Sequence, residues 1–311
     1  MDPYSPDLQQ PQPAGRRIRV SWIVGFLLGF AIVMFRAHPD VVLAAVDEIE
    51  TVLQLKSTPV PASPPKFSPE LAGQVDAMTP QGQAELLLDE SINHYAGAIE
   101  MIEPRLERWH GNLQLTPKLS QILSTAMNSN DLRVRAAALE TYIAAYNVEK
   151  STNGVSTLED RIGAQPEARP WALWMLGALG NRGVEPVGVL REELNYIHDS
   201  NEQTRMWAVE GLAILGTDDA LEPLLDSFKN DPSPRVRERA ACGLAQSGMF
   251  TEPQRMSIVP RLLDMAEDTG LDGQTRTWVF HALQDITGAS QGSDPQAWRR
   301  WWNERGANGR R

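Results

Sequence analysis

A repeating pattern of arginine and apolar residues runs through most of the chain after its first third. Arginine recurs at intervals of 34, 36, 32 and 39 residues, at Arg135, Arg169, Arg205, Arg237 and Arg276. A small or apolar residue follows each arginine after three positions, and an apolar or aromatic residue follows after seven. These two positions share one face of an α-helix, so the pattern predicts five helices with a buried stripe. Glycine follows after eleven positions in the middle three copies, and we expect each of these helices to end there with left-handed backbone, at Gly180, Gly216 and Gly248.

Each of these helices has a predicted antiparallel partner before it. Thr116-Pro117 offers an N-cap and a proline at the first helical position, and Thr79-Pro80 does the same for an earlier hairpin. The later pairs are predicted at 155–162 with 169–180, 187–197 with 204–215, 220–228 with 234–245, and 253–265 with 275–286. One hairpin per 32 to 39 residues predicts an all-α fold, an α-solenoid of about five repeats.

Two further segments frame the predicted repeats at 116–288. A leading helical hairpin is expected over 79–115, and a tryptophan-rich cap over 289–311. In the cap, Trp298, Trp301 and Trp302 are spaced to share one helix face. We therefore expect this helix to cover the end of the last hairpin.

An uncharged stretch near the N-terminus predicts a membrane anchor. Residues 20–35 carry no charge, three arginines precede them within residues 16–19, and Arg36 follows. At about 1.5 Å per residue they span roughly 24 Å, somewhat less than the roughly 30 Å of a bilayer core. We predict a basic N-terminus at 1–19 and a single-pass anchor at 20–36; the alternative is a cleaved secretory signal, for which small residues at the end of the apolar run are lacking. The excess of arginine before the anchor favours a cytoplasmic N-terminus, with the repeats outside the cytoplasm.

Small residues recur every fourth position within the anchor, at Ser21, Gly25 and Gly29. Such spacing permits close helix packing, and residues 37–56 continue as a predicted helical stalk with apolar residues at 3-4-3 spacing. A parallel homodimer through anchor and stalk is one interpretation, and glycines without a partner helix are the other. Residues 57–78 follow as a proline-rich linker.

The net negative charge of the chain lies entirely after residue 69. Residues 1–69 hold six acidic and six basic residues, which leaves 34 acidic and 23 basic residues for 70–311. An acidic surface repels phosphate, so we expect no nucleic-acid partner. The single cysteine, Cys242, excludes an internal disulfide.

Paired aspartate and arginine residues resemble a known repeat signature. Asp199 with Thr204-Arg205, and Asp231 with Val236-Arg237, are similar to the Asp…Val-Arg signature of HEAT repeats of the PBS-lyase-like type. The similarity covers roughly residues 116–288, and the segment 237–244 and the C-terminal tryptophans also resemble bacterial membrane-anchored HEAT-repeat proteins. The resemblance implies a structural ladder that bridges adjacent units, formed by Asp199, Arg205, Asp231 and Arg237. The other three units lack an aspartate six residues before their arginine, so the resemblance assigns them no ladder partner.

A stripe of tryptophans lies two residues after the arginines. Trp171, Trp207 and Trp278 share this position, which Arg239 takes in the fourth unit and Ala137 in the first. The position falls near the edge of the predicted apolar face. Two interpretations follow: the indoles pack between repeats, or the row Trp171, Trp207, Arg239 and Trp278 forms a surface for an extended peptide.

Residues with catalytic or metal-binding spacing are scarce. None of the five histidines is followed by glutamate, and neither His-x-x-x-His nor paired cysteines occur. We therefore predict no catalytic, cofactor or metal site, and a non-catalytic, membrane-anchored scaffold that binds a protein or peptide partner. The alternative is an enzyme on a HEAT scaffold, either a metal- or cofactor-dependent hydroxylase or a bilin-lyase-like protein.

Overall fold

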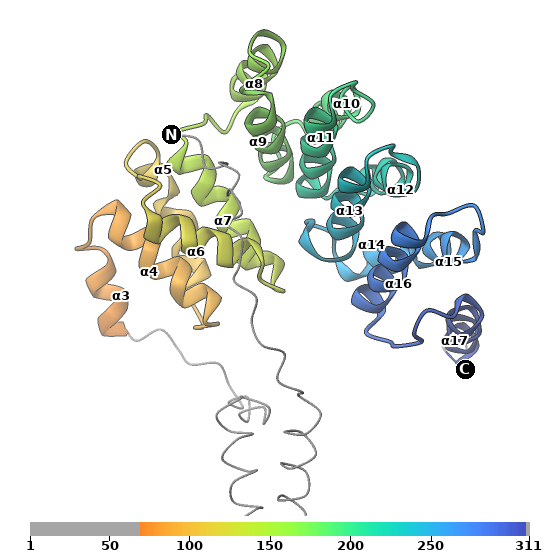
Figure 1. Ribbon diagram of the computed structural model, residues 1–311. Helices are drawn as coiled ribbons and strands as arrows, with labels where there is room; N and C mark the ends of the chain where they lie inside the picture. Colours follow the sequence, from red (N-terminus) through yellow and green to blue (C-terminus); the bar gives the residue numbers. More distant parts are fainter. Residues whose placement is uncertain (1–68, 309–311) are drawn as a thin grey trace, which may run out of the picture. The chain divides into compact units, whose positions relative to one another are not determined.

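The computed structural model describes residues 69–308. Contacts divide the chain into two units, 1–63 and 64–311, and the described residues belong to the second. Helices succeed one another along this part of the chain and no strand occurs in it, so the predicted all-α fold is confirmed (Figure 1). The predicted anchor, stalk and most of the linker lie outside the described residues.

The first helices form a group of their own. They are α3 (Pro69–Val75), α4 (Pro80–Ile92), the 3-10 turns η1 (Ile99–Met101) and η2 (Glu103–Arg105), α5 (Leu106–Trp109), α6 (Pro117–Met127) and α7 (Leu132–Ala145). The helices α4 and α6 begin as predicted, because the hydroxyls of Thr79 and Thr116 accept hydrogen bonds from the backbone N–H groups of Gly82 and Leu119. The second half of the leading hairpin is broken into short turns around Pro104, whose ring disfavours a continuous helix.

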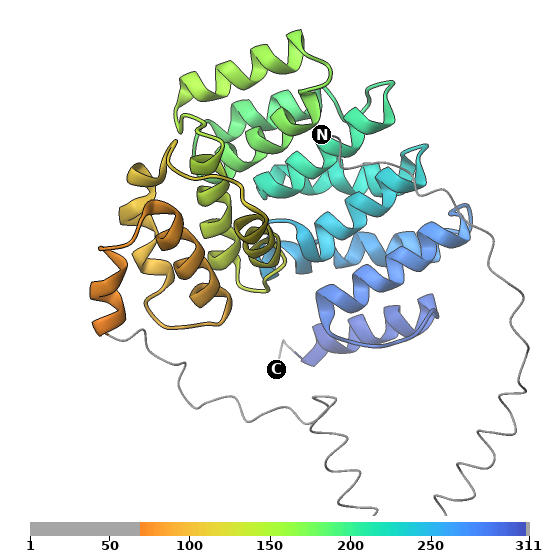
Figure 2. The same ribbon diagram turned by 60° about the vertical axis from the view of Figure 1, so that its left-hand side comes forward.

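The later helices are consecutive antiparallel pairs (Figures 1 and 2). They are α8 (Thr152–Ala164) with α9 (Arg169–Asn181), α10 (Pro186–Leu194) with α11 (Glu202–Leu215), α12 (Leu221–Asn230) with α13 (Pro234–Cys242), and α14 (Glu252–Ser257) and α15 (Val259–Glu267) with α16 (Gly273–Thr287). The 3-10 turn η3 (Asp218–Ala220) precedes α12, the π-helix η4 (Gly243–Ser247) extends α13, and α17 (Pro295–Asn308) ends the described part. The expected single helix over 253–265 is wrong, since it breaks at Ile258 before Pro260.

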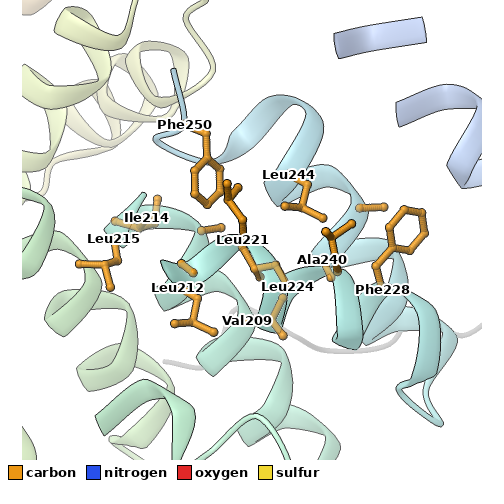
Figure 3. Packing of buried hydrophobic residues seen from close by; sticks show 14 of the residues in the cluster. Val209, Leu212, Ile214, Leu215, Leu221, Leu224, Phe228, Ala240, Leu244 and Phe250 are labelled. Atoms are coloured by element: carbon orange, nitrogen blue, oxygen red, sulfur yellow. The ribbon is translucent and has the colours of Figure 1, made fainter. Parts of the chain in front are cut away.

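Apolar side chains of successive pairs share a continuous core. The larger of two clusters runs from Leu139 of α7 to Trp298 of α17, and the smaller one joins α3 to α7. Figure 3 shows one joint, where α11, α12 and η4 contribute the buried residues Leu212, Leu224, Phe228 and Leu244 to one cluster. Trp298 is 1% exposed, so α17 covers the end of the repeats as the spacing of its tryptophans predicts.

Only one of the three glycines predicted to end helices does so with left-handed backbone. Gly216 caps α11 with φ +68°, whereas Gly180 lies inside α9 and Gly248 has φ −75°. The small size of Gly180 instead suits packing, because a Cβ there would lie 2.6 Å from a methyl carbon of Leu215 and 3.0 Å from one of Val189. The expectation of left-handed backbone is therefore wrong for Gly180 and Gly248, although the helix ends one residue after Gly180 and Gly248 is the C-cap of η4.

Candidate binding face

Four neighbouring helices place one side chain each at the same register. Trp171 of α9, Trp207 of α11 and Trp278 of α16 are half-buried and pack against the large core, while Arg239 of α13 is exposed. Contacts of α9 with α11, of α11 with α13 and of α13 with α16 set the order of the four. We call these four residues the row. Its tryptophans are held rigidly by the core and still reach the surface.

Aromatic side chains gather at the α9 end of the row. Trp171 and Trp174 meet Tyr146 and Tyr142 of α7 edge to face, with ring centroids 5.4 and 5.1 Å apart. The guanidinium carbon of Arg161 lies 5.0 Å from the centre of the Trp171 ring. Such pairs stabilise beyond the area that they bury, so this end of the row is a fixed aromatic surface.

An ion pair lies at the middle of the row. Arg239 Nη1 is 3.4 Å from Glu210 Oε2, and the Glu210 side chain, one turn after Trp207, is 17% exposed. Burial raises the pKa of Glu210 and Arg239 opposes this shift. Glu210 Oε2 and the indole nitrogen of Trp207 are both enclosed and have no hydrogen-bond partner among residues 69–308.

Cys242 follows Arg239 by one turn of α13 and is exposed. Partial desolvation by neighbouring atoms raises the pKa of the thiol; Arg239 lowers it, and the carboxylates of Glu238, Glu210 and Asp285 raise it further. The thiol is therefore held in its protonated form, which is the poorer nucleophile. This environment does not favour a reactive cysteine.

The four predicted ladder residues lie along another line of contacts. Arg205 Nε and Nη2 donate to the two carboxylate oxygens of Asp231 at 2.8 and 3.1 Å, and its Nη1 donates to the backbone oxygen of Asp199 at 2.9 Å. Arg237 Nη1 donates to the backbone oxygen of Asp231 at 2.7 Å, while its Nη2 lies 3.4 Å from Asp272 Oδ2. Arg205 and Arg237 thus have the same arrangement. Each donates a hydrogen bond to a backbone oxygen that precedes its own helix, and each also contacts an aspartate side chain of the next unit.

The remaining arginines differ from one another. Arg169 Nη1 lies 3.8 Å from Asp199 Oδ2 of the next unit, although its own unit has no aspartate four or six residues before the arginine. Arg276 donates to the backbone oxygens of Asp268 and Leu271. Arg135 Nη1 reaches the backbone oxygens of Gln246 and Gly248, at 2.6 and 2.9 Å, and so ties α7 to the end of η4.

Residues 155–245 match the family model of HEAT repeats. This stretch is a HEAT-repeat region. Among solved structures, an engineered protein determined by the Northeast Structural Genomics Consortium is similar, with 16% sequence identity and a TM-score of 0.33 over 69% of this chain and 90% of that chain. Comparison with curated proteins gives no match.

The HEAT-repeat region contains α9, α11 and α13, and hence three residues of the row. Glu210 was missed by sequence reasoning, because a glutamate among 34 acidic residues carries no signal of its burial. Its register relates Glu210 to Glu140, which is buried and follows Arg135 by the same five positions that separate Glu210 from Arg205.

Glu140 lies in a cleft of about 490 Å³ beside the HEAT-repeat region. Its Oε1 accepts hydrogen bonds from Lys150 Nζ at 2.6 Å and Arg182 Nε at 2.8 Å. Apolar side chains of η1, α5 and α7 form much of the lining, together with Met249. Two cationic side chains of the protein thus already pair with the Glu140 carboxylate, so this cleft is a weaker candidate than the row.

The described part of the chain holds neither a cluster of metal ligands nor a membrane-spanning helix. No group of three or more histidine, cysteine, aspartate or glutamate side chains in residues 69–308 could hold a metal ion. Over the same residues no helix has the length and apolar character to cross a membrane. The predicted anchor packing residues Ser21, Gly25 and Gly29 lie outside the described residues.

Proposed function

We propose that this chain is a non-catalytic, membrane-anchored scaffold that binds a protein or peptide partner through the row Trp171, Trp207, Arg239 and Trp278. The observation that carries the proposal is the row itself: large side chains in one register, packed against the core and still accessible. Tryptophan and arginine are the residue types most enriched in binding hot spots. Stacked hairpins supply the elongated surface on which such a row can act, although the fold alone assigns no function.

Site-specific crosslinking in intact cells tests the binding face. A photoreactive phenylalanine derivative replaces Trp207 or Trp278 in the full-length chain, and a matched control replaces exposed Glu222 of α12. We expect discrete adducts with the same partner from both row positions and none from position 222. Adducts that are equal at all three positions, or absent from both row positions, would contradict a binding face on the row.

The membrane part of the proposal rests on the sequence of residues 20–36. An uncleaved anchor keeps the full-length chain in the membrane fraction after alkaline extraction, whereas deletion of 20–36 releases it. Cys242 serves as a natural topology probe, since it is the single cysteine and is exposed. Labelling by a membrane-impermeant maleimide in intact cells is expected if the repeats lie outside the cytoplasm; labelling only after lysis would overturn this orientation.

A homodimer through the anchor is a separate part of the proposal. Isoleucine at both Gly25 and Gly29 would block close approach of two anchor helices, because the branched side chain occupies the space that glycine leaves. Crosslinking of the full-length chain in membranes should yield dimers for the unaltered anchor and monomers for the Gly25→Ile, Gly29→Ile variant. Dimers in both would exclude this packing face.

A further inference from the structure

One carboxyl group of the repeats is buried without a partner. Glu193 of α10 is 0% exposed, and neither of its carboxylate oxygens has a hydrogen-bond partner within residues 69–308. The group lies directly on the backbone of α11, since a Cβ added to Gly211 would be 2.3 Å from its Oε1 and 2.6 Å from its Oε2. Glycine at position 211 therefore leaves the space that this carboxyl fills. In such a place the neutral acid is far more stable than the carboxylate, which has neither a hydrogen bond nor a counter-ion.

The charged groups of the neighbouring helices do not compensate Glu193. α10 packs against α9 and α11 (Figure 1), and every charged side chain of these two helices forms an ion pair with another residue: Arg169, Glu202, Arg205 and Glu210. Of the two charged neighbours on α10, exposed Arg191 and Glu192, only Glu192 acts on this carboxyl, and its negative charge disfavours ionisation. Glu159 of α8 adds a further acid near Glu192. The packed position of α10 therefore suits the protonated form of Glu193.

Little apolar surface holds α10 in place. Val189 is its one buried apolar side chain. The corresponding helix of the next pair, α12, buries four: Leu221, Leu224, Leu225 and Phe228. The helix also begins at Glu185, whose φ of +44° is unfavourable for a residue other than glycine and whose side chain makes no capping hydrogen bond. Few buried contacts and an uncapped, strained start are what allow a segment to open locally.

We propose that α10 is a pH-sensitive element, which stays packed on α9 and α11 while Glu193 carries its proton and detaches when this carboxyl ionises. The proton passes to solvent, and the carboxylate of the detached helix is hydrated. Detachment uncovers Gly180 of α9, where an added Cβ would lie 3.0 Å from a methyl carbon of Val189. It thereby exposes apolar surface on α9 and α11, the helices that carry Trp171 and Trp207. The inference goes beyond the proposed function, since it needs no partner.

The direction of the response follows from where the proton is held more tightly. Burial, with a smaller contribution from Glu192, raises the pKa of Glu193 well above its ordinary value, so the packed state binds the proton more tightly than the detached state. Detachment is therefore least favourable near the ordinary glutamate pKa, about 4.3, and becomes easier as pH rises toward the raised value. Because one proton is lost, the equilibrium constant for detachment should rise about tenfold per pH unit over this range.

Hydrogen exchange of the full-length chain, followed by mass spectrometry, distinguishes local detachment from unfolding of the whole domain. Exchange is measured at several pH values from about 5 to 8 and corrected for the intrinsic exchange rate at each. We expect the protection of the α10 amides to fall about tenfold per pH unit and to stay below that of the α12 amides throughout. Protection of α10 that does not change with pH overturns the inference. Equal protection of α10 and α12 also overturns it, because α10 would then open only together with the rest of the fold.

Substitutions of Glu193 assign the response to this carboxyl. Glu193→Gln keeps the size of the side chain but has no proton to lose, so the protection of α10 should become independent of pH. Glu193→Met is a second uncharged variant and should behave in the same way, which keeps the test valid if the amide is poorly accommodated. Glu107→Gln removes an exposed carboxylate on α5 and is the matched control, which should retain the tenfold response. A response that persists in both Glu193 variants, or that disappears in Glu107→Gln, overturns the inference.

Discussion

Arg205 holds Asp231 of the next hairpin at two points. The two hydrogen bonds, of 2.8 and 3.1 Å, join side chains that are only 10% and 3% exposed. Asp231 Oδ1 also accepts from the backbone N–H of Ser233, which fixes the turn between α12 and α13. One carboxylate therefore links two successive hairpins and shapes the turn between two helices.

Loss of this carboxylate should destabilise the fold strongly. Asp231→Ala leaves the Arg205 guanidinium buried without its counter-ion, and we expect the free energy of unfolding to fall by about 3–5 kcal/mol. The matched control is Glu222→Ala, which breaks an ion pair with Arg261 whose side chains are 64% and 57% exposed. This change should cost less than about 1 kcal/mol in urea unfolding. Similar losses for the two variants would contradict a structural role for the buried pair.

The double variant Arg205→Met, Asp231→Leu sharpens the test. Apolar residues of similar size leave no unpaired charge, so we expect it to be more stable than Asp231→Ala alone. If the double variant is less stable than Asp231→Ala, the loss of the ion pair itself costs more stability than the unpaired Arg205 charge does in the single variant.

The repeat, its period and several helix starts could be predicted from the sequence because they are local. Thr79 and Thr116 cap the helices that follow them, and a cap requires only neighbouring residues. The contact of Arg135 with Gln246 and Gly248 could not be predicted, since it joins residues 111 and 113 positions apart. The register located the row, but the enclosure of Glu210 depends on how α11 packs against α13. For the same reason the contact between Gly180 and Leu215 of α11 could not be predicted.

Glu193 should make stability depend on pH. Its side chain is fully buried on α10, both carboxylate oxygens have no hydrogen-bond partner within residues 69–308, and burial raises its pKa well above the usual value, with a smaller contribution from Glu192. The folded state therefore holds this proton more tightly than the unfolded state. Its stabilising contribution is complete below the ordinary glutamate pKa and is lost as pH rises through the raised folded value.

Replacing the carboxyl by an amide removes this dependence. Glu193→Gln should match the unaltered protein near pH 4 and exceed it by more than about 1 kcal/mol at pH 8, since each pKa unit corresponds to about 1.4 kcal/mol. Thermal unfolding of the full-length chain at both pH values measures the difference. Exposed Glu107→Gln is the control, and a parallel response of both variants would show that net charge rather than burial is responsible.

The contact between α9 and α11 requires glycine at position 177. A Cβ on Gly177 would lie 2.3 Å from the backbone oxygen of Gly211. Because backbone cannot move aside as a side chain does, Gly177→Ala should force α9 and α11 apart and cost about 1–3 kcal/mol. Gly163→Ala in α8 is the matched control, since nothing lies within 4 Å of its added carbon and alanine favours helix. We expect this control to be neutral or stabilising in urea unfolding; a destabilisation equal to that of Gly177→Ala would point to helix propensity instead of contact.

Substitutions of Trp207 distinguish its contact with the core from its contact with a partner. Trp207→Ala should lower both stability and crosslinking, because the ring is half-buried against the core, and we expect a loss of about 1–3 kcal/mol. Trp207→Phe keeps an aromatic ring there and removes an indole N–H that has no acceptor in the described structure. Its unfolding temperature should therefore remain close to that of the unaltered protein. Crosslinking through position 278 should persist in Trp207→Phe and fall in Trp207→Ala; an equal fall in both variants would contradict a role for the aromatic ring at position 207 in binding.

Arg135 and Arg255 donate to the same two backbone oxygens at the end of η4, those of Gln246 and Gly248. Burial lowers the pKa of both guanidiniums, and for Arg135 the positive charge of Arg255 lowers it further. Loss of one arginine leaves each oxygen with a donor and relieves the repulsion between the two charges. Loss of both leaves the oxygens, which carry the negative end of the helix dipole, without either donor.

The effects of the two substitutions should therefore not be additive. We expect Arg135→Met and Arg255→Met each to lower the free energy of unfolding modestly, and the double variant to lose more than the sum of the two, by a coupling of about 0.5–3 kcal/mol. Hydrogen exchange at the Met249 amide gives a local readout. This N–H donates to Ala213 O at 2.8 Å, and Met249 directly follows Gly248, one of the two residues whose backbone oxygens the arginines share. Exchange there should accelerate sharply only in the double variant. If the two losses in free energy of unfolding are strictly additive, or if Arg135→Met alone fully accelerates exchange at Met249, the two arginines act on η4 independently. Arg135 would then hold α7 to η4 without support from Arg255.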